Sequence, residues 1–173
     1  MAFKLYATTS QRLAPAEIAA HAQRAEALGY DGLNIPEAVH DGFVGATLAL
    51  AATTRIRVAT SVALAFPRSP MVTAIAAWDL AALSGGRFEL GVGRGYREHE
   101  FKGFGIDIKS RKAMTEEGLD ILKLAFSGDQ FSYDGKHYEV KNARLSPTPI
   151  QHPLPIWLGA ATETARKEVA TAG

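Results

Sequence analysis

The segment Leu83–Tyr96 constrains the fold more than any other part of this 173-residue chain. It combines the end of an apolar helix, the pair Gly85-Gly86, a short strand over 87–92 and a loop in which glycine occupies every second position. Glycine ends helices and lets the backbone approach a ligand closely. A helix that leads into a strand and then such a loop is the repeating unit of α/β enzymes, whose sites lie at the carboxyl ends of their strands. Functional residues are therefore expected in the loops that follow the strands.

The rest of the chain predicts five successive pairs of strand and helix. Apolar, β-rich segments predict strands at 3–8, 32–36, 56–64, 87–92 and 155–158. Apolar spacing and glycine stops predict helices at 15–28, 44–54, 72–83, 110–126 and 162–172. Asp134-Gly135 predicts a hairpin over 131–140.

Two helices show an apolar face in the sequence. In the first it consists of Ile18, Ala22, Ala25 and Leu28, and in the third of Val72, Ile75, Ala76 and Leu83.

Five successive strand–helix units fit either a doubly wound open sheet or part of a (β/α)₈ barrel, which normally takes about 250 residues. The local pattern does not separate these two architectures.

Composition excludes several classes of function. A net charge of +1 gives no electrostatic reason to expect nucleic acid or an anionic membrane as partner. The chain has no cysteine, which excludes disulfides, thiolate metal sites and cysteine nucleophiles. No stretch looks like a signal peptide or a membrane span, so a cytoplasmic location is expected. A catalyst or binder of small molecules fits best.

Six ordered segments carry a resemblance to a known family. They are 28–32 with Glu37 and His40, 59–62 with 67–70, 83–95, Phe101 with Phe104-Gly105, 133–138, and 155–160. Through them the chain resembles the luciferase-like family of flavin and deazaflavin oxidoreductases along nearly its whole length. The resemblance implies a (β/α)₈ TIM barrel with an insertion after the fourth strand. Residues 1–173 then form one barrel domain that is truncated before its sixth strand, and 96–140 contain part of the insertion.

The same resemblance implies a site for reduced FMN or for the deazaflavin coenzyme F420. No metal is expected, because His99, between Glu98 and Glu100, has no second ligand group at metal spacing. A cis peptide bond at Ser61-Val62 is expected to form a bulge against the cofactor ring. Arg94, in an Arg-Gly pair, is expected to bind the phosphate, because a planar guanidinium suits bidentate contact with phosphate oxygens. Tyr96 packs along the cofactor or covers the insertion. The full set of implied cofactor residues is Ser61, Val62, Gly93, Arg94, Gly95, Tyr96 and Gly159.

Glu37 and His40 are the candidate catalytic residues. A histidine exchanges protons near neutral pH and a carboxylate can orient it, so the pair suits general acid–base chemistry or substrate positioning. In the bacterial luciferase pattern the histidine follows this glutamate directly, whereas Ala38 and Val39 intervene here, an arrangement more like a deazaflavin-dependent branch. The competing interpretation is that both residues serve only helix capping and loop polarity.

The resulting functional hypothesis is a luciferase-like oxidoreductase or monooxygenase. It would use reduced FMN with oxygen, or F420 for hydride transfer to a small organic substrate. A separate reductase as supplier of reduced cofactor and a homo-oligomeric full-length protein are expected partners. The alternative is a noncatalytic flavin-binding protein or an inactive fragment of the enzyme.

Overall fold

A computed structural model describes residues 3–146 and 154–159. Its main sheet is parallel and runs in the order β1 (Tyr6–Thr8), β2 (Gly32–Ile35), β3 (Arg57–Thr60) and β5 (Phe88–Gly93). Two further strands also pair with β5 in parallel, β4 (Ala63–Leu64) and β8 (Ile156–Leu158). The predicted α/β class is therefore confirmed. Within the described residues β1 and β8 each pair with one neighbour, so the sheet is an open arc and not a closed barrel.

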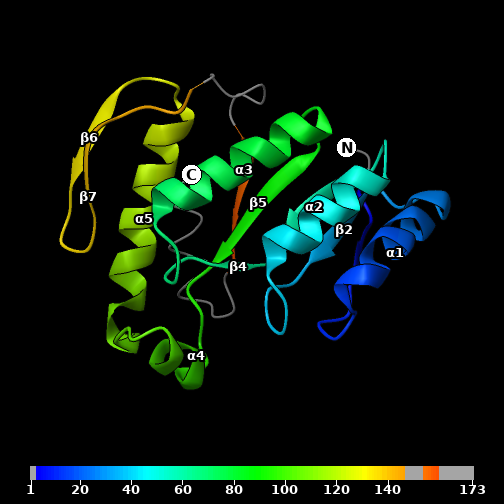
Figure 1. The fold of residues 1–173 in the computed structure, drawn as a ribbon, viewed down its shortest axis with the longest axis horizontal. Coiled ribbons are helices and arrows are strands. Elements are labelled where there is room, and N and C mark those ends of the chain that lie inside the picture. Colours follow the sequence, from blue (N-terminus) through cyan, green and yellow to red (C-terminus); the bar gives the residue numbers. More distant parts are fainter. Residues whose placement is uncertain (1–2, 147–153, 160–173) are drawn as a thin grey trace.

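Three helices cover one face of this sheet: α1 (Pro15–Ala27), α2 (Gly42–Ala52) and α3 (Pro70–Ser84) (Figure 1). The core lies between these helices and the strands. Leu33, Val58, Phe88 and Leu90 are fully buried there, as expected for strands of a parallel sheet. None of the helices in the described parts of the chain is both long and apolar enough to cross a membrane.

The chain after β5 adds a helix that packs next to α3 and contributes Ile121, Leu122 and Phe126 to the same core, followed by a small hairpin. This part of the chain contains α4 (Glu98–Gly103), the 3₁₀ turn η1 (Ile108–Ser110), α5 (Arg111–Phe126) and the antiparallel hairpin of β6 (Phe131–Asp134) and β7 (Glu139–Ala143). Figure 1 shows the hairpin alongside α5. The Glu117 carboxylate on α5 holds the hairpin turn by accepting hydrogen bonds from the backbone N–H groups of residues 136–138.

The predicted continuous strand over 56–64 is wrong, because the chain leaves the sheet between β3 and β4. Ala59 pairs with Glu89 and Ala63 with Val92. Three residues (60–62) therefore lie between these pairings on the β3–β4 side, but only two (90–91) on β5. The extra residue makes a bulge. The bulge coincides with the Ser61–Val62 peptide bond, which is cis as the resemblance predicted.

The apolar face that the sequence indicates for α3 points to solvent. Val72 and Leu83 are each 55% exposed, whereas Ala74, Ala77 and Ala81 are fully buried against the sheet. Since α3 is apolar nearly all round, the periodic signal did not distinguish its two faces. Leu28 on the first helical face is likewise exposed, because α1 ends one residue earlier.

Three smaller expectations also change. The loop after β5 contains the helix α4, which was not predicted. Ser110 precedes α5 without a side-chain cap, and Asp107 instead caps η1 through Lys109 N. The first strand begins at Tyr6, later than the apolar segment suggested. The helix expected at 162–172 lies outside the described residues.

Candidate cofactor site at the strand ends

The carboxyl ends of the strands and the starts of α4 and α5 line an open cavity of about 670 Å³, here called the mouth cavity. Eight of the nine predicted site residues line it: Glu37, Ser61, Val62, Gly93, Arg94, Gly95, Tyr96 and Gly159. These residues come from the loops after β2, β3, β5 and β8, except Gly93, which is the last residue of β5. The parallel topology thus brings together segments that are up to 122 positions apart in the sequence.

Val62 and two glycines form the floor of the mouth cavity. A Cβ atom on Gly93 would overlap Cγ2 of Val62, and one on Gly159 would lie 3.3 Å from Cγ1 of the same side chain. Side chains at these two positions would therefore displace Val62. An apolar floor with bare backbone beside it suits a flat ring system.

Cationic side chains dominate the polar part of the mouth cavity. Four basic residues line it, against two carboxylates: Arg94, Arg97, Arg111 and Lys112 against Glu37 and Glu100. Arg97 pairs with Glu100 at 2.9 Å, and this hydrogen bond, followed by the interaction with Tyr96, raises the pKa of Arg97. The Arg94 guanidinium lies 3.7 Å from Glu116 on α5. This donor set fits a phosphate or another anionic group.

The carboxylate of Glu37 is engaged by protein groups. It accepts a hydrogen bond from Leu64 N at 2.7 Å and hydrogen bonds from both terminal nitrogens of Arg68. Arg68 also pairs with Asp41, at 2.6 Å. Burial alone would lower the pKa of Arg68, but its hydrogen bonds to Glu37 and Asp41 outweigh burial and raise it.

The structure does not bring His40 to the mouth cavity. His40 is absent from its lining, and the loop around it serves to start α2, where Asp41 accepts hydrogen bonds from Phe43 N and Val44 N. The competing interpretation assigns helix capping and loop polarity to Glu37 and His40, but the residue that caps α2 is Asp41. The acid–base role of Glu37 and His40 remains a prediction.

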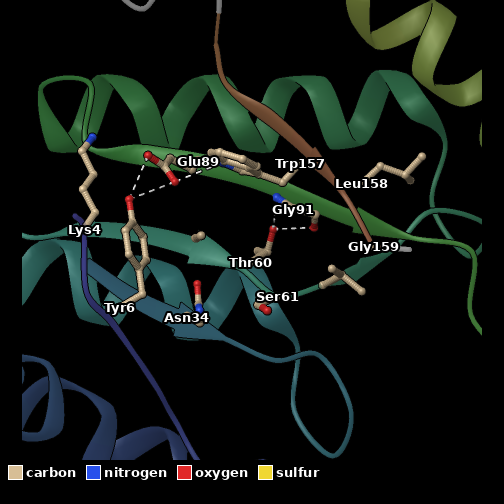
Figure 2. A pocket seen from close by; sticks show the side chains of 12 residues that line it. Lys4, Tyr6, Asn34, Thr60, Ser61, Glu89, Gly91, Trp157, Leu158 and Gly159 are labelled. Carbon is tan, nitrogen blue, oxygen red and sulfur yellow. Dashed lines mark hydrogen bonds between the residues drawn. The ribbon is translucent and has the colours of Figure 1, made fainter. Parts of the chain in front are cut away.

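A second cavity of about 420 Å³ lies on the concave face of the sheet and shares Ser61, Val62 and Gly159 with the first. Glu89 lines it and accepts hydrogen bonds from Tyr6 Oη and Trp157 Nε1 (Figure 2), and also from Arg57 Nε. Burial and then the charge of Glu89 raise the pKa of Tyr6 to about 12. This network joins β1, β3, β5 and β8 across the inside of the arc.

Sequence reasoning missed the basic residues Arg97, Arg111 and Lys112. The only signal was a pair of cations at the start of a predicted helix. Their position on the cavity depends on how α4 and α5 fold back toward the strand ends. Within 3–146 and 154–159 no group of three or more histidine or acidic side chains could hold a metal ion.

The fold and this cavity define a class of protein, an α/β barrel-type domain with a ligand site at the carboxyl ends of its strands. The chain belongs to the luciferase-like monooxygenase family, whose model matches residues 2–173. It is 32% identical over 164 residues to the uncharacterized protein Rv1360 of Mycobacterium tuberculosis, covering 90% of this chain and 48% of that protein. The chain thus spans about half the length of the curated relatives it matches.

Solved structures of similar fold come from enzymes with both kinds of cofactor. The monooxygenase RslO1 from Streptomyces bottropensis superimposes with a TM-score of 0.88 at 23% identity, over 97% of this chain and 56% of that one. The coenzyme F420-dependent tetrahydromethanopterin reductase from Methanopyrus kandleri superimposes with a TM-score of 0.79 at 20% identity, over 95% of this chain and 52% of that one. A third structure is the oxygenating constituent of 3,6-diketocamphane monooxygenase from Pseudomonas putida, in complex with FMN. It superimposes with a TM-score of 0.79 at 20% identity, over 91% of this chain and 51% of that one.

Proposed function

We propose that the chain supplies the cofactor-binding part of an oxidoreductase that uses reduced FMN with oxygen, or F420 for hydride transfer. The observation that carries this proposal is the mouth cavity, where an apolar glycine-lined floor lies beside four basic side chains. The residues present fit such a cofactor. Val62, Gly93 and Gly159 would hold its ring, and Arg94 with Arg111 and Lys112 would hold its anionic tail. When bound, the ring would accept or donate a hydride or react with oxygen.

The remaining parts of the proposal follow from the resemblance to the luciferase-like family. The substrate is a small organic molecule, and a separate reductase supplies reduced cofactor. The full-length protein is a homo-oligomer. Residues 96–140, which build α4, α5 and the hairpin, contain part of the family's insertion.

A noncatalytic flavin-binding protein is the second candidate. The observation that favours it is the state of the two candidate catalytic residues, since the Glu37 carboxylate is engaged by Arg68 and His40 lies off the cavity. Such a protein would bind cofactor without oxidising a substrate.

A side-by-side titration with FMN and F420 tests the proposal. Saturable binding of one ring, with a shifted absorption spectrum, is expected. Binding of neither would refute it. Adding a substrate panel to the reduced complex then separates the two candidates, because substrate-dependent oxidation of the cofactor is expected only of the enzyme.

A further inference from the structure

Arg68 connects two acidic residues to the edge of the mouth cavity. Its guanidinium donates to both oxygens of Glu37 and to Asp41, while Glu37 also accepts from Leu64 N. The Glu37 side chain is only 11% exposed and that of Arg68 21%. One cation is therefore shared by two carboxylates, which leaves the cluster with a net charge of −1. Solvent access is limited at Glu37, whereas the Asp41 side chain is 42% exposed.

This ion cluster bears on the position of the cavity floor. Leu64, which Glu37 holds, pairs with Gly93 in the sheet, and the next residue donates from Ala65 N to Gly93 O at 3.0 Å. Val62, two residues before Leu64, lies directly over Gly93. A shift of Leu64 would therefore move both the bulge and the glycine loop that follows β5.

We propose that Arg68 is a positioning residue. Together with Glu37 it forms a clamp that fixes Leu64 and, through Leu64, the floor made by Val62 and Gly93. In this role Glu37 acts as a structural acceptor and does not transfer protons. The inference rests on the proposed function for its ligand readout, but the clamp itself can be measured in the free protein.

The cost of an unpaired charge predicts how single and double variants of this clamp should rank. Removing one partner of a buried ion pair leaves an uncompensated charge, which costs more than replacing both partners by neutral groups. Arg68→Met should therefore be worse than Arg68→Met combined with Glu37→Gln, since a glutamine oxygen can still accept from Leu64 N. Arg68→Lys keeps the charge but loses the forked geometry, so it should lie between wild type and Arg68→Met.

The experiment measures FMN and F420 affinity from the ring absorption, and hydrogen–deuterium exchange of residues 63–65 in the free protein. Arg68→Met should weaken cofactor binding on the order of tenfold and speed hydrogen exchange at 63–65. The reason is that Leu64, no longer fixed by the clamp, lets the cavity floor move. The double variant should recover most of both. Arg24→Met, on the exposed face of α1, serves as control and should change neither.

Three results would overturn the proposal. The first is unchanged affinity and exchange in Arg68→Met. The second is weaker binding in the double variant than in Arg68→Met, which would place Glu37 in contact with the cofactor. The third is faster exchange in Arg68→Met that the double variant does not restore. If wild type binds neither cofactor, the proposed function fails, while the exchange data still decide the clamp.

Discussion

Thr60 and Gly91 are joined by a reciprocal pair of hydrogen bonds at the point where the sheet is interrupted. The Thr60 hydroxyl donates to Gly91 O at 2.8 Å and accepts from Gly91 N at 2.9 Å (Figure 2). A Cβ atom on Gly91 would overlap the carbonyl oxygen of Thr60. The threonine side chain thus replaces the backbone pairing that the bulge at Ser61–Val62 removes, and only glycine allows the approach.

Thr60→Val should destabilise the protein by about 1–3 kcal/mol, the cost of leaving buried backbone groups without partners. Valine keeps the shape of threonine, so the loss reports the hydroxyl alone. Denaturant unfolding measures it. Thr47→Val is the matched control, because its hydroxyl is exposed and donates to Phe43 O within its own helix, and it should stay within about 0.5 kcal/mol. Equal effects of both substitutions would contradict the role given to Thr60.

Arg94→Ala should weaken cofactor binding by about 1.5–3 kcal/mol, the scale of a hydrogen bond to a charged group, while the fold stays intact. The reason is that Arg94 lines the mouth cavity beside the glycine loop. Titrations with FMN and F420 and a thermal melt check both parts of the expectation. Arg24→Ala provides a surface control. Unchanged affinity for both cofactors would remove Arg94 from the site.

Glu26 should make the stability depend on pH in the acid range. Its carboxylate accepts hydrogen bonds from the backbone of Thr54, Arg55 and Ile56. Burial alone would raise the pKa of Glu26, but these hydrogen bonds, with that of Arg55 foremost, lower it. A carboxyl whose pKa is lower in the folded state stabilises the fold above its unfolded pKa, and this stabilisation disappears as pH falls through the folded pKa.

Glu26→Gln should accordingly cost roughly 1 kcal/mol near neutral pH, a value kept small because the site is open to solvent. The difference from wild type should shrink as pH falls below the ordinary range of a glutamate. Urea unfolding between neutral pH and acid measures it, with Glu139→Gln, on the exposed hairpin, as control. A difference that stays constant with pH would contradict the assignment.

The 173-residue chain expressed by itself should associate and should not be an active monomer. Among residues 3–146 and 154–159, no further strand pairs with the outer edge of β1 or of β8, and apolar side chains near these edges are exposed, Phe3 to 96% and Trp157 to 59%. Such edges recruit other strands. Size-exclusion chromatography with light scattering, followed by an activity assay on each peak, tests this. A cooperatively melting monomer that turns over reduced cofactor would contradict the expectation.

The sequence by itself determined the order of most strands and helices along the chain, but not α4, η1 or the break between β3 and β4. Through the family resemblance it also indicated most of the candidate site. Pro15, Gly29 and Gly128 mark helix ends by local chemistry, and the hairpin at Asp134-Gly135 depends only on its turn, so these features were predictable. Eight of nine predicted site residues meet on one cavity because parallel strands present their carboxyl ends at the same edge.

Only the tertiary structure decided which side of α3 is buried, because Val72 and Ala74 are both apolar and the sheet selects between them. It likewise decided the partner of Glu37. The loop sequence places this glutamate near His40, but folding sets Arg68, 31 positions away, against its carboxylate. Arg111 and Lys112 reach the mouth cavity for the same reason. A charge pairs with whichever opposite charge folding places beside it, and local sequence does not encode that distance.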